Sequence, residues 1–456
     1  MVPRHFALVL LSFVVVGVLV GFGLANHGTG ASEHLGDGYA LQIYGNASGD
    51  WYVDEADIEF LRAIIAGEEE ATEFADANRD GVIDERDIDQ VQRLIDGTAD
   101  TIWLLDGNGD PIKVSLPIQR IGVEYLSNAE LMNVLGVSDR VVALDSAAYI
   151  LREVYFPGRD DFLAMGQMHA NPAYETIFEM ELDALFTFSP FNIDVKQQNL
   201  PDTDIVFLGL YWPNVIEPQD SQFVQGVLKA GYLLGAPARA YAYVDWLLGL
   251  VETMAERTAG IAEEARPHVL MTSYSRYFQD GETLEASIYT KIDPLTQACL
   301  LAGCQPIAEA IPDWLGEGGV YGTTVDMEWV LTEDPDFIFA HNVRYTYSGI
   351  AREPSYGYDE SDPAPMNEAL LEMKERPLLA ELQAVQRDRI YITAGDFRNN
   401  AMGGVLGAAY LARILHPELF ADLDPQAIHQ TFVTDWMGID FDLSQDGVFI
   451  APALTD

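Results

Sequence analysis

From about residue 100 onward, short apolar runs alternate with amphipathic helical stretches, and one long helical stretch divides this alternation into two series. Such a pattern predicts parallel sheets covered by helices. We therefore predict an α/β fold of two lobes, each built on a central, mostly parallel sheet. The predicted strands are Arg120–Val123, Val141–Leu144, Ala184–Phe188 and Asp204–Leu208 in the first lobe, and His268–Thr272, Phe337–Ala340 and Arg389–Thr393 in the second. The predicted helices are Asn128–Leu135, Tyr174–Glu179, Phe223–Leu234, Leu295–Ala302, Asp326–Leu331 and Met402–Leu415.

The stretch between the two series predicts a single long helix. Pro237 suits a first helical turn, and the pattern continues to about Glu264. Its apolar stripe consists of Val244, Leu247, Leu248, Val251 and Met254. About 28 residues would give ~42 Å of helix. We expect this segment, residues 236–266, to join an N-terminal lobe (100–235) rigidly to a C-terminal lobe (267–456).

Composition excludes several classes of protein. The 456 residues exceed a typical domain of ~150, so several parts are expected. The 72 acidic and 25 basic residues give a net charge of −47, which argues against a nucleic-acid partner, because phosphate contacts need a basic face. Neither a Gly-x-Ser-x-Gly, nor a phosphate-loop, nor a His-Glu-x-x-His motif occurs. We therefore predict that the chain is not an enzyme.

The N-terminus carries an uncharged apolar run, Phe6–Leu24, after Arg4 and His5. Its ~19 residues are just enough to cross a bilayer as a helix. Residues 1–26 are therefore either a signal peptide, cut after Ala25, or an uncleaved membrane anchor. Both alternatives place the remainder outside the cytoplasm, on the cell surface or in a periplasm-like space. Residues 27–40 are predicted to be a Gly-rich linker.

Residues 76–87 have the spacing of a calcium-binding loop. Oxygen-bearing side chains occupy positions 1, 3, 5, 9 and 12, Gly81 stands at position 6 where the turn is sharp, and Val82 offers its carbonyl. The predicted Ca²⁺ ligands are Asp76, Asn78, Asp80, Val82, Asp84 and Asp87.

A similar loop begins 30 residues earlier, and we expect it to bind Ca²⁺ more weakly, because Trp51 replaces the turn glycine and two ligands are neutral. Its predicted ligands are Asn46, Ser48, Asp50, Tyr52, Asp54 and Asp57. A third candidate, Asp106–Asp110, has no acid at the later positions, and Gly107 and Gly109 indicate a hairpin turn instead.

Two 12-residue loops ending in Asp, each followed by one apolar helix pattern, resemble a type I dockerin module over about residues 44–97. The resemblance implies a small all-α, EF-hand-like domain, assigned here to residues 41–98, and a cohesin-like partner. Since no other part of the sequence identifies a cohesin, a calcium-stabilised spacer or docking module is the simpler interpretation.

Six stretches of the remaining chain, in the right order, together resemble the class III (cluster A, helical-backbone) substrate-binding proteins of ABC transporters. They are Leu116–Val123, Gly136–Ala143, Asn171–Leu185, Asp326–Ile338, Leu382–Tyr391 and Ala409–Phe420. The resemblance implies capture of an iron–siderophore complex, haem, cobalamin or an oxyanion between two lobes, and its delivery to an ABC permease and its ATPase. It also implies that Glu175 and Glu328, one per lobe, pair with arginines of the permease.

Residues that follow strand ends should face the ligand cleft, because open α/β sheets bind ligands outside the carboxyl ends of their strands. Aromatic and arginine side chains gather there, which suits a flat or anionic metal chelate. The candidates are Tyr125, Ser127, Ser189, Tyr211 and Trp212 in the N-terminal lobe, and Tyr274, Arg276, Tyr277, His341, Arg344, Tyr345 and Arg398 in the C-terminal lobe.

Three questions stay open at this point. His169 is either a metal or haem ligand or an ordinary surface or capping residue. Cys299 and Cys304 would be too far apart in a continuous helix, ~8 Å between Cα atoms, but a helix ending near Gly303 would let them form a disulfide. A function from another class is a cell-surface assembly protein that docks through the calcium module.

Overall fold

The computed structural model describes residues 34–36, 38–168, 172–210, 216, 222–274, 285–317, 319–342, 356–358, 360–400 and 402–454. The described residues all lie in one compact unit, Ser32–Asp456. The apolar run Phe6–Leu24 falls outside them. Among the helices that are described, none has the length and apolar character needed to cross a membrane.

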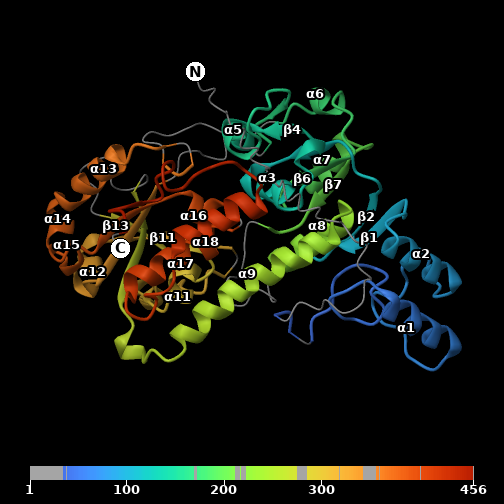
Figure 1. The fold of residues 1–456 in the computed structure, drawn as a ribbon, viewed down its shortest axis with the longest axis horizontal. Helices are drawn as coiled ribbons and strands as arrows, with labels where there is room; N and C mark the ends of the chain where they lie inside the picture. Colours follow the sequence, from blue (N-terminus) through green and yellow to red (C-terminus); the bar gives the residue numbers. More distant parts are fainter. Residues whose placement is uncertain are drawn as a thin grey trace, which may run out of the picture. The chain divides into compact units, whose positions relative to one another are not determined.

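The N-terminal lobe contains a parallel five-stranded sheet in the order β5-β4-β3-β6-β7 (Figure 1). Four strands fall where the sequence predicts them; the short β5 does not. The strands are β3 (Ile121–Val123), β4 (Val141–Asp145), β5 (Leu163–Gly166), β6 (Ala184–Thr187) and β7 (Asp204–Phe207). The helices are α3 (Tyr125–Val134), α4 (Ser146–Ile150), α5 (Arg152–Tyr155), α6 (Tyr174–Phe178), α7 (Ile193–Asn199) and α8 (Gln222–Leu233).

The C-terminal lobe has a second five-stranded sheet in the order β10-β8-β12-β13-β14, of which only β14 runs antiparallel to its neighbour. Its strands are β8 (His268–Ser273), β10 (Gln305–Pro306), β12 (Phe337–Asn342), β13 (Ile390–Ala394) and β14 (Ile450–Ala451). An antiparallel pair not expected from the sequence, β9 (Glu285–Tyr289) with β11 (Gly322–Asp326), packs beside it.

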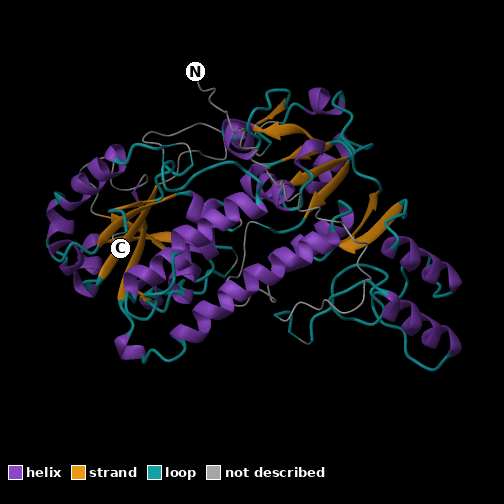
Figure 2. Cartoon of the chain, in the orientation of Figure 1, coloured by secondary structure: helices purple, strands orange, loops and turns teal. Residues whose placement is uncertain are grey.

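Helices lie against the strands of both lobes (Figure 2). Those of the C-terminal lobe are α11 (Pro294–Leu301), α12 (Met327–Glu333), α13 (Ala364–Lys374), α14 (Pro377–Ala380), α15 (Gln383–Gln386), α16 (Asp396–Asn399), α17 (Gly403–Leu415) and α18 (Pro425–Thr431). Short 3₁₀ or π segments are Ser138–Arg140, Glu263–Ala265, Ile307–Ala310 and Phe432–Trp436.

The long helix between the lobes, α9 (Pro237–Thr258), is confirmed but is shorter than the predicted 236–266. Its 22 residues span ~33 Å. The chain turns at Ala259 and Gly260, since glycine is a poor helix former, and Glu263–Ala265 forms a separate 3₁₀ turn. The whole predicted stripe is buried, from Val244 to Met254, and α9 contacts α3 and α8 of one lobe and α11 and α17 of the other.

Residues 41–98 form two helices, α1 (Glu55–Ala66) and α2 (Glu85–Ile95), each preceded by one of the acidic loops. Both begin with a capping box, made by Asp54 with Asp57 and by Asp84 with Asp87. The hairpin expected at Gly107 and Gly109 is present: β1 (Thr101–Leu105) pairs antiparallel with β2 (Pro111–Ser115).

This N-terminal region is packed firmly onto α8 and α9. Lys229 of α8 donates to Gln42 Oε1 and to Leu105 O, both at 2.7 Å. Tyr241 of α9 donates to Trp51 O at 2.6 Å, and its ring stacks on Tyr52. One continuous apolar cluster includes residues of this region and of both lobes. The two acidic loops are therefore part of the body of the protein.

The open question about the cysteines is answered. Cys299 and Cys304 form a disulfide with Cα atoms 5.7 Å apart. The bond is possible because α11 ends at Leu301 and the chain reverses at Gly303, whose φ is +80°. It joins the end of α11 to the approach to β10.

Candidate functional site

The order of the N-terminal sheet places a topological switch point between β3 and β6. From β3 the chain moves outward to β4 and β5, and then returns to the other side of β3 as β6 and β7. The carboxyl ends of two such strands bound a crevice where doubly wound sheets hold ligands. Glu124 and Tyr125 follow β3, and Thr187 ends β6, with Ser189 two residues further on. The predicted residues Tyr125 and Ser189 are thus brought to one point.

A buried network of charged and polar groups underlies this switch point. Lys196 Nζ on α7 lies 2.6 Å from Glu124 Oε1, and both side chains are almost completely buried. Glu124 Oε2 accepts from Thr187 Oγ1 at 2.9 Å and from Phe188 N at 3.1 Å. Because the carboxylate is paired and its oxygens are hydrogen-bonded, its burial is compensated. The network holds the ends of β3 and β6 together.

Two features above this network point to ligand binding. Tyr125 has φ +68°, a strained conformation for a residue with a side chain, and such strain concentrates at functional sites. Its ring lies 4.1 Å, centroid to centroid, from that of Phe188. Ser189 is buried, and its hydroxyl has no hydrogen-bond partner among the described residues. A buried hydroxyl without a partner is costly unless something else satisfies it.

Asp145 adds a second carboxyl group at the carboxyl end of β4. It caps α4 by accepting from Ala148 N at 2.9 Å. Burial raises its pKa to about 7, hydrogen bonds from backbone amides oppose the rise, and the charge of Glu124 adds to it. Ser127, also predicted to face the ligand, lies buried in the first turns of α3.

The C-terminal sheet has its own switch point, between β8 and β12, because β10 lies on one side of β8 while β12 and β13 lie on the other. His341 of β12 is paired in register with Ser273 of β8 and Thr393 of β13. His341 Nδ1 lies 3.1 Å from Tyr289 Oη and 3.2 Å from Thr272 O. His341 therefore lies inside β12, one residue before its carboxyl end, and not after the strand as predicted; it is held there by β9.

Arg398 and Tyr274 are held by acidic partners. Arg398 forms an ion pair of 2.6 Å with Asp293, the completely buried N-cap of α11, and its guanidinium lies over the Tyr289 ring. Tyr274 follows β8 and donates to Glu372 Oε2 at 3.1 Å. Burial, and then the charge of Glu372, raise the pKa of Tyr274 to about 12, so its hydroxyl stays protonated.

Several predicted positions lie outside the described residues: Tyr211, Trp212, Arg276, Tyr277, Arg344, Tyr345 and His169. Conversely, the sequence reasoning missed Glu124, Asp145 and Lys196. Glu124 and Asp145 directly end or follow predicted strands, so the strand-end rule could have found them. Lys196 stands on a helix that was not predicted, and no local signal marked it.

The two predicted permease-docking acids are both exposed. Glu175 lies in the first turn of α6 and Glu328 in the first turn of α12. An acidic side chain in a first helical turn is also favoured by the helix dipole alone.

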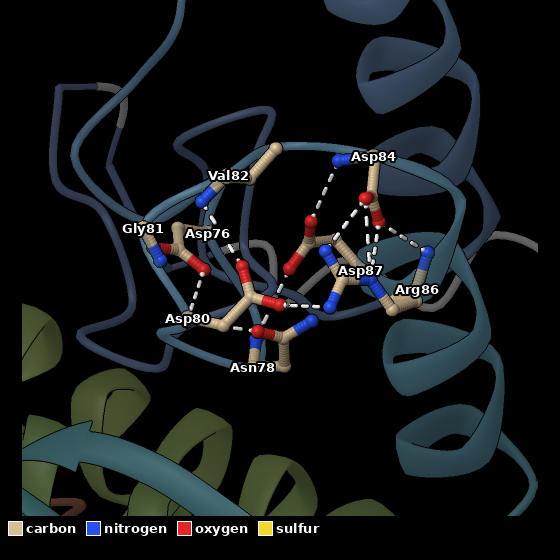
Figure 3. A network of polar contacts seen from close by, with 8 residues as sticks. All are labelled: Asp76, Asn78, Asp80, Gly81, Val82, Asp84, Arg86 and Asp87. Atoms are coloured by element: carbon tan, nitrogen blue, oxygen red, sulfur yellow. Dashed lines mark hydrogen bonds and ion pairs between the residues drawn. The ribbon is translucent and has the colours of Figure 1, made fainter.

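The second acidic loop brings its predicted ligands around one turn (Figure 3). Gly81 has φ +90°, as its position requires. Asp76 accepts from the amides of Asp80 and Gly81, and Asp87 accepts from those of Asn78 and Asp84. Arg86 pairs with both Asp80 and Asp84. Nowhere in the described residues do three acidic, His or Cys side chains converge into a ready metal site.

This donor set consists of the hard oxygens that Ca²⁺ prefers. The side chains fit the ion in chemical type, although Asp80 and Asp84 would have to exchange Arg86 for it. The first loop fits less well. Asn46 Nδ2 donates to Leu41 O and Asp50 O, so this buried side chain already serves the fold. Burial raises the pKa of Asp57 to about 7, against the opposing effect of hydrogen bonds from Ser48 and Asp54.

Comparison with known proteins identifies the fold. No protein-family model matches the chain, and no curated protein matches its sequence. Solved structures do match. The TroA-like periplasmic binding protein FepB from Veillonella parvula aligns with TM-score 0.59 and 15% identity, over 76% of this chain and 98% of that one. The molybdate-bound MolA of Haemophilus influenzae gives 0.54 and 14%, over 75% and 99%.

A third structure, CeuE of Helicobacter pylori in a complex with Ni-His, gives TM-score 0.52 and 14% identity, over 75% of this chain and 96% of that one. At these identities the likeness concerns the fold. The chain therefore has the two-lobed fold of TroA-like solute-binding proteins.

Proposed function

We propose that the protein is an extracytoplasmic solute-binding protein of an ABC importer and binds its ligand at the two switch points. The observation that carries this proposal is Ser189. Its buried hydroxyl, just beyond the carboxyl end of β6, has no hydrogen-bond partner among the residues that the structure describes. The fold shared with FepB, MolA and CeuE supports the same role.

The proposed ligand is a metal chelate, most simply an iron–siderophore-type complex. The rings of Tyr125 and Phe188 form a buried aromatic pair beside Ser189, against which a flat chelate would pack. Tyr289 and His341 offer a second aromatic pair in the other lobe, with the cation of Arg398 beside it. Haem, cobalamin and molybdate are the competing ligands in the test.

The test is isothermal titration of the protein with a ferric siderophore, haem, cobalamin and molybdate in turn, with Ser189→Ala alongside. The substitution removes a hydroxyl that bonds no described residue, so the fold should keep its stability while the affinity falls. Losing one hydrogen bond to a ligand weakens binding by about tenfold. Ser115→Ala, on the exposed strand β2, is the matched control. Unchanged affinity in Ser189→Ala, or no binding of any of the four, would contradict the proposal.

Delivery to a permease is proposed to use Glu175 and Glu328. The double charge reversal Glu175→Lys with Glu328→Lys should leave ligand affinity unchanged, because both side chains are exposed on helices. It should abolish ligand-stimulated ATP hydrolysis by the reconstituted transporter. Reversing Glu179, the exposed C-cap residue of α6, is the control.

For the acidic loops we propose one tight calcium ion, in residues 76–87. Asp76, Asn78, Asp80, Val82, Asp84 and Asp87 would hold it, and the ion would fix the entry to α2. Titration with CaCl₂ should give a stoichiometry of about one, and Asp76→Ala should abolish it. Arg86→Gln should tighten binding, since it removes the cation that competes for Asp80 and Asp84. Weaker binding by Arg86→Gln would contradict this assignment.

A further inference from the structure

The two lobes also meet through hydrogen bonds away from the strand ends. Glu130 of α3 accepts from the backbone amide of Met402, the N-cap of α17, at 2.8 Å. Asn400 Nδ2 donates to Tyr155 Oη at 2.7 Å. Glu130 and Tyr155 belong to the N-terminal lobe, whereas Asn400 and Met402 belong to the C-terminal lobe. These two bonds therefore link the lobes directly.

In each of the two side chains that link the lobes, Glu130 and Asn400, one oxygen takes no part in these hydrogen bonds. Glu130 Oε2 and Asn400 Oδ1 are both buried, and neither has a hydrogen-bond partner in the described part of the chain. Both residues line the same small cavity, which has no room for a water molecule. With its nitrogen toward Tyr155 Oη, the Asn400 amide avoids placing an oxygen 3.4 Å from Asp396 Oδ1.

Two buried acceptors that line one cavity need a hydrogen that neither supplies when Glu130 is ionised. A protonated carboxyl group has one, since it carries an O–H donor. A single proton on Oε2 would let Glu130 donate to Asn400 Oδ1 while Oε1 still accepts from Met402. It would satisfy both oxygens at once.

The groups around Glu130 favour that proton. Asp396 of α16 faces it with a negative charge, and the phenols of Tyr155, Tyr243 and Tyr358 face it from α5, α9 and the approach to α13. His429 of α18, on the same cavity, is neutral because burial lowers its pKa to about 3. Burial, with a smaller contribution from Asp396, raises the pKa of Glu130 to about 8 against the opposing Met402 hydrogen bond.

We propose that protonated Glu130 is a latch between the lobes, which holds them together through Met402 and Asn400 while it is neutral and loosens their contact when it ionises. The latch goes beyond ligand capture: it would let the proton concentration outside the cell bias how far the lobes separate.

The direction of the effect follows from proton linkage. In the unfolded chain a Glu titrates near pH ~4.3, whereas folded Glu130 keeps its proton to about pH 8. Stability from this group is therefore complete at low pH and is lost as the pH rises through that interval. Across it the unfolding equilibrium constant should increase about tenfold per pH unit more than in a variant without the carboxyl group.

The experiment measures urea unfolding of the full chain from pH 5 to 9, for the wild type and Glu130→Gln. Glutamine keeps an acceptor for Met402 and a donor for Asn400 but cannot ionise. Between pH 5 and 8, unfolding of the wild type should release about one more proton than unfolding of the variant. Its free energy of unfolding should therefore fall more steeply with pH. Glu179→Gln, at the exposed C-cap of α6, should match the wild type. Parallel pH profiles for wild type and Glu130→Gln would overturn the proposal.

A second measurement does not depend on whether that variant folds. Hydrogen exchange at the Met402 amide of the wild type, corrected for the intrinsic rate, should lose protection about tenfold per pH unit between pH 5 and 8, because opening exposes and ionises Glu130. Above pH 8, where Glu130 is ionised in both states, protection should level off. Protection that stays constant from pH 5 to 8 would also overturn the latch.

Discussion

At the scale of single residues, the buried pair Lys196–Glu124 makes the sharpest stability prediction. Both groups are at most 2% exposed. Lys196→Met leaves Glu124 as an uncompensated buried charge and should cost about 3–5 kcal/mol of unfolding free energy at pH 7. Urea denaturation measures the loss.

The control is the double variant Lys196→Met with Glu124→Gln, which removes both charges. It should recover most of the lost stability, because replacing a buried pair as a unit is often nearly neutral. If the double variant were as unstable as the single one, packing of the lysine stem and not charge compensation would be the reason.

Asp145 gives a pH-dependent prediction at the same scale. Burial raises its pKa to about 7, above the ~3.9 of an unfolded aspartate. Between these values the folded protein binds a proton that the unfolded chain does not, so stability falls as the pH rises. Asp145→Asn keeps a good N-cap for α4. Between pH ~4 and ~7 the free energy of unfolding of this variant should depend less on pH, by the amount that corresponds to one bound proton. Equal slopes in the two proteins would contradict the raised pKa.

At the scale of elements, the sequence predicts most strands of both central sheets and the β1–β2 hairpin, but it misses β5, β10 and β14 and the antiparallel pair β9 with β11. β3, β4, β8 and β12 each contain a run of mainly apolar, mainly buried residues, which is why they can be recognised. β11 has no fully buried residue, and β14 has only two residues, so neither has a periodicity to detect. The predicted end of α9 was wrong. The apolar stripe is correct, but it does not indicate where Gly260 turns the chain.

The disulfide at the end of α11 allows an element-scale test. It closes a short loop, and a bond of this separation should stabilise the fold by about 2 kcal/mol through the unfolded chain. Cys299→Ser with Cys304→Ser should lower the thermal midpoint accordingly, measured by calorimetry. Because both sulfurs are buried, the native wild type should resist reductant that acts rapidly in urea. Rapid reduction of the native protein would show that this end of α11 opens locally.

At the scale of the whole molecule, the attachment of residues 41–98 decides what their removal would do. Lys229 is buried, and burial lowers its pKa to about 7. Deleting 41–98 takes away its Gln42 acceptor and uncovers the apolar surface of α8 and α9. We expect the deletion to lower the thermal midpoint markedly and to do so less in a Lys229→Met background. If the deletion lowered the thermal midpoint equally in both backgrounds, the destabilisation would come from lost apolar contacts alone.

The two-lobe architecture and the strand-end positions of Tyr125, Ser189, Tyr274 and His341 could be predicted from the sequence, since they follow from strand order alone. The partners of these residues could not. Lys196, Glu372 and Asp293 bind partners that are 72, 98 and 105 residues away in the sequence. No local sequence pattern indicates such pairs.

The attachment of residues 41–53 to α8 and α9 has a practical consequence. A dye attached to the outer surface of α2 would turn with the N-terminal lobe as one body, without the wobble of a flexible tether. Paired with a second dye on α13, it would form a molecular ruler whose energy-transfer efficiency reads the separation of the lobes. Single molecules could then be watched opening and closing as solute and pH are varied.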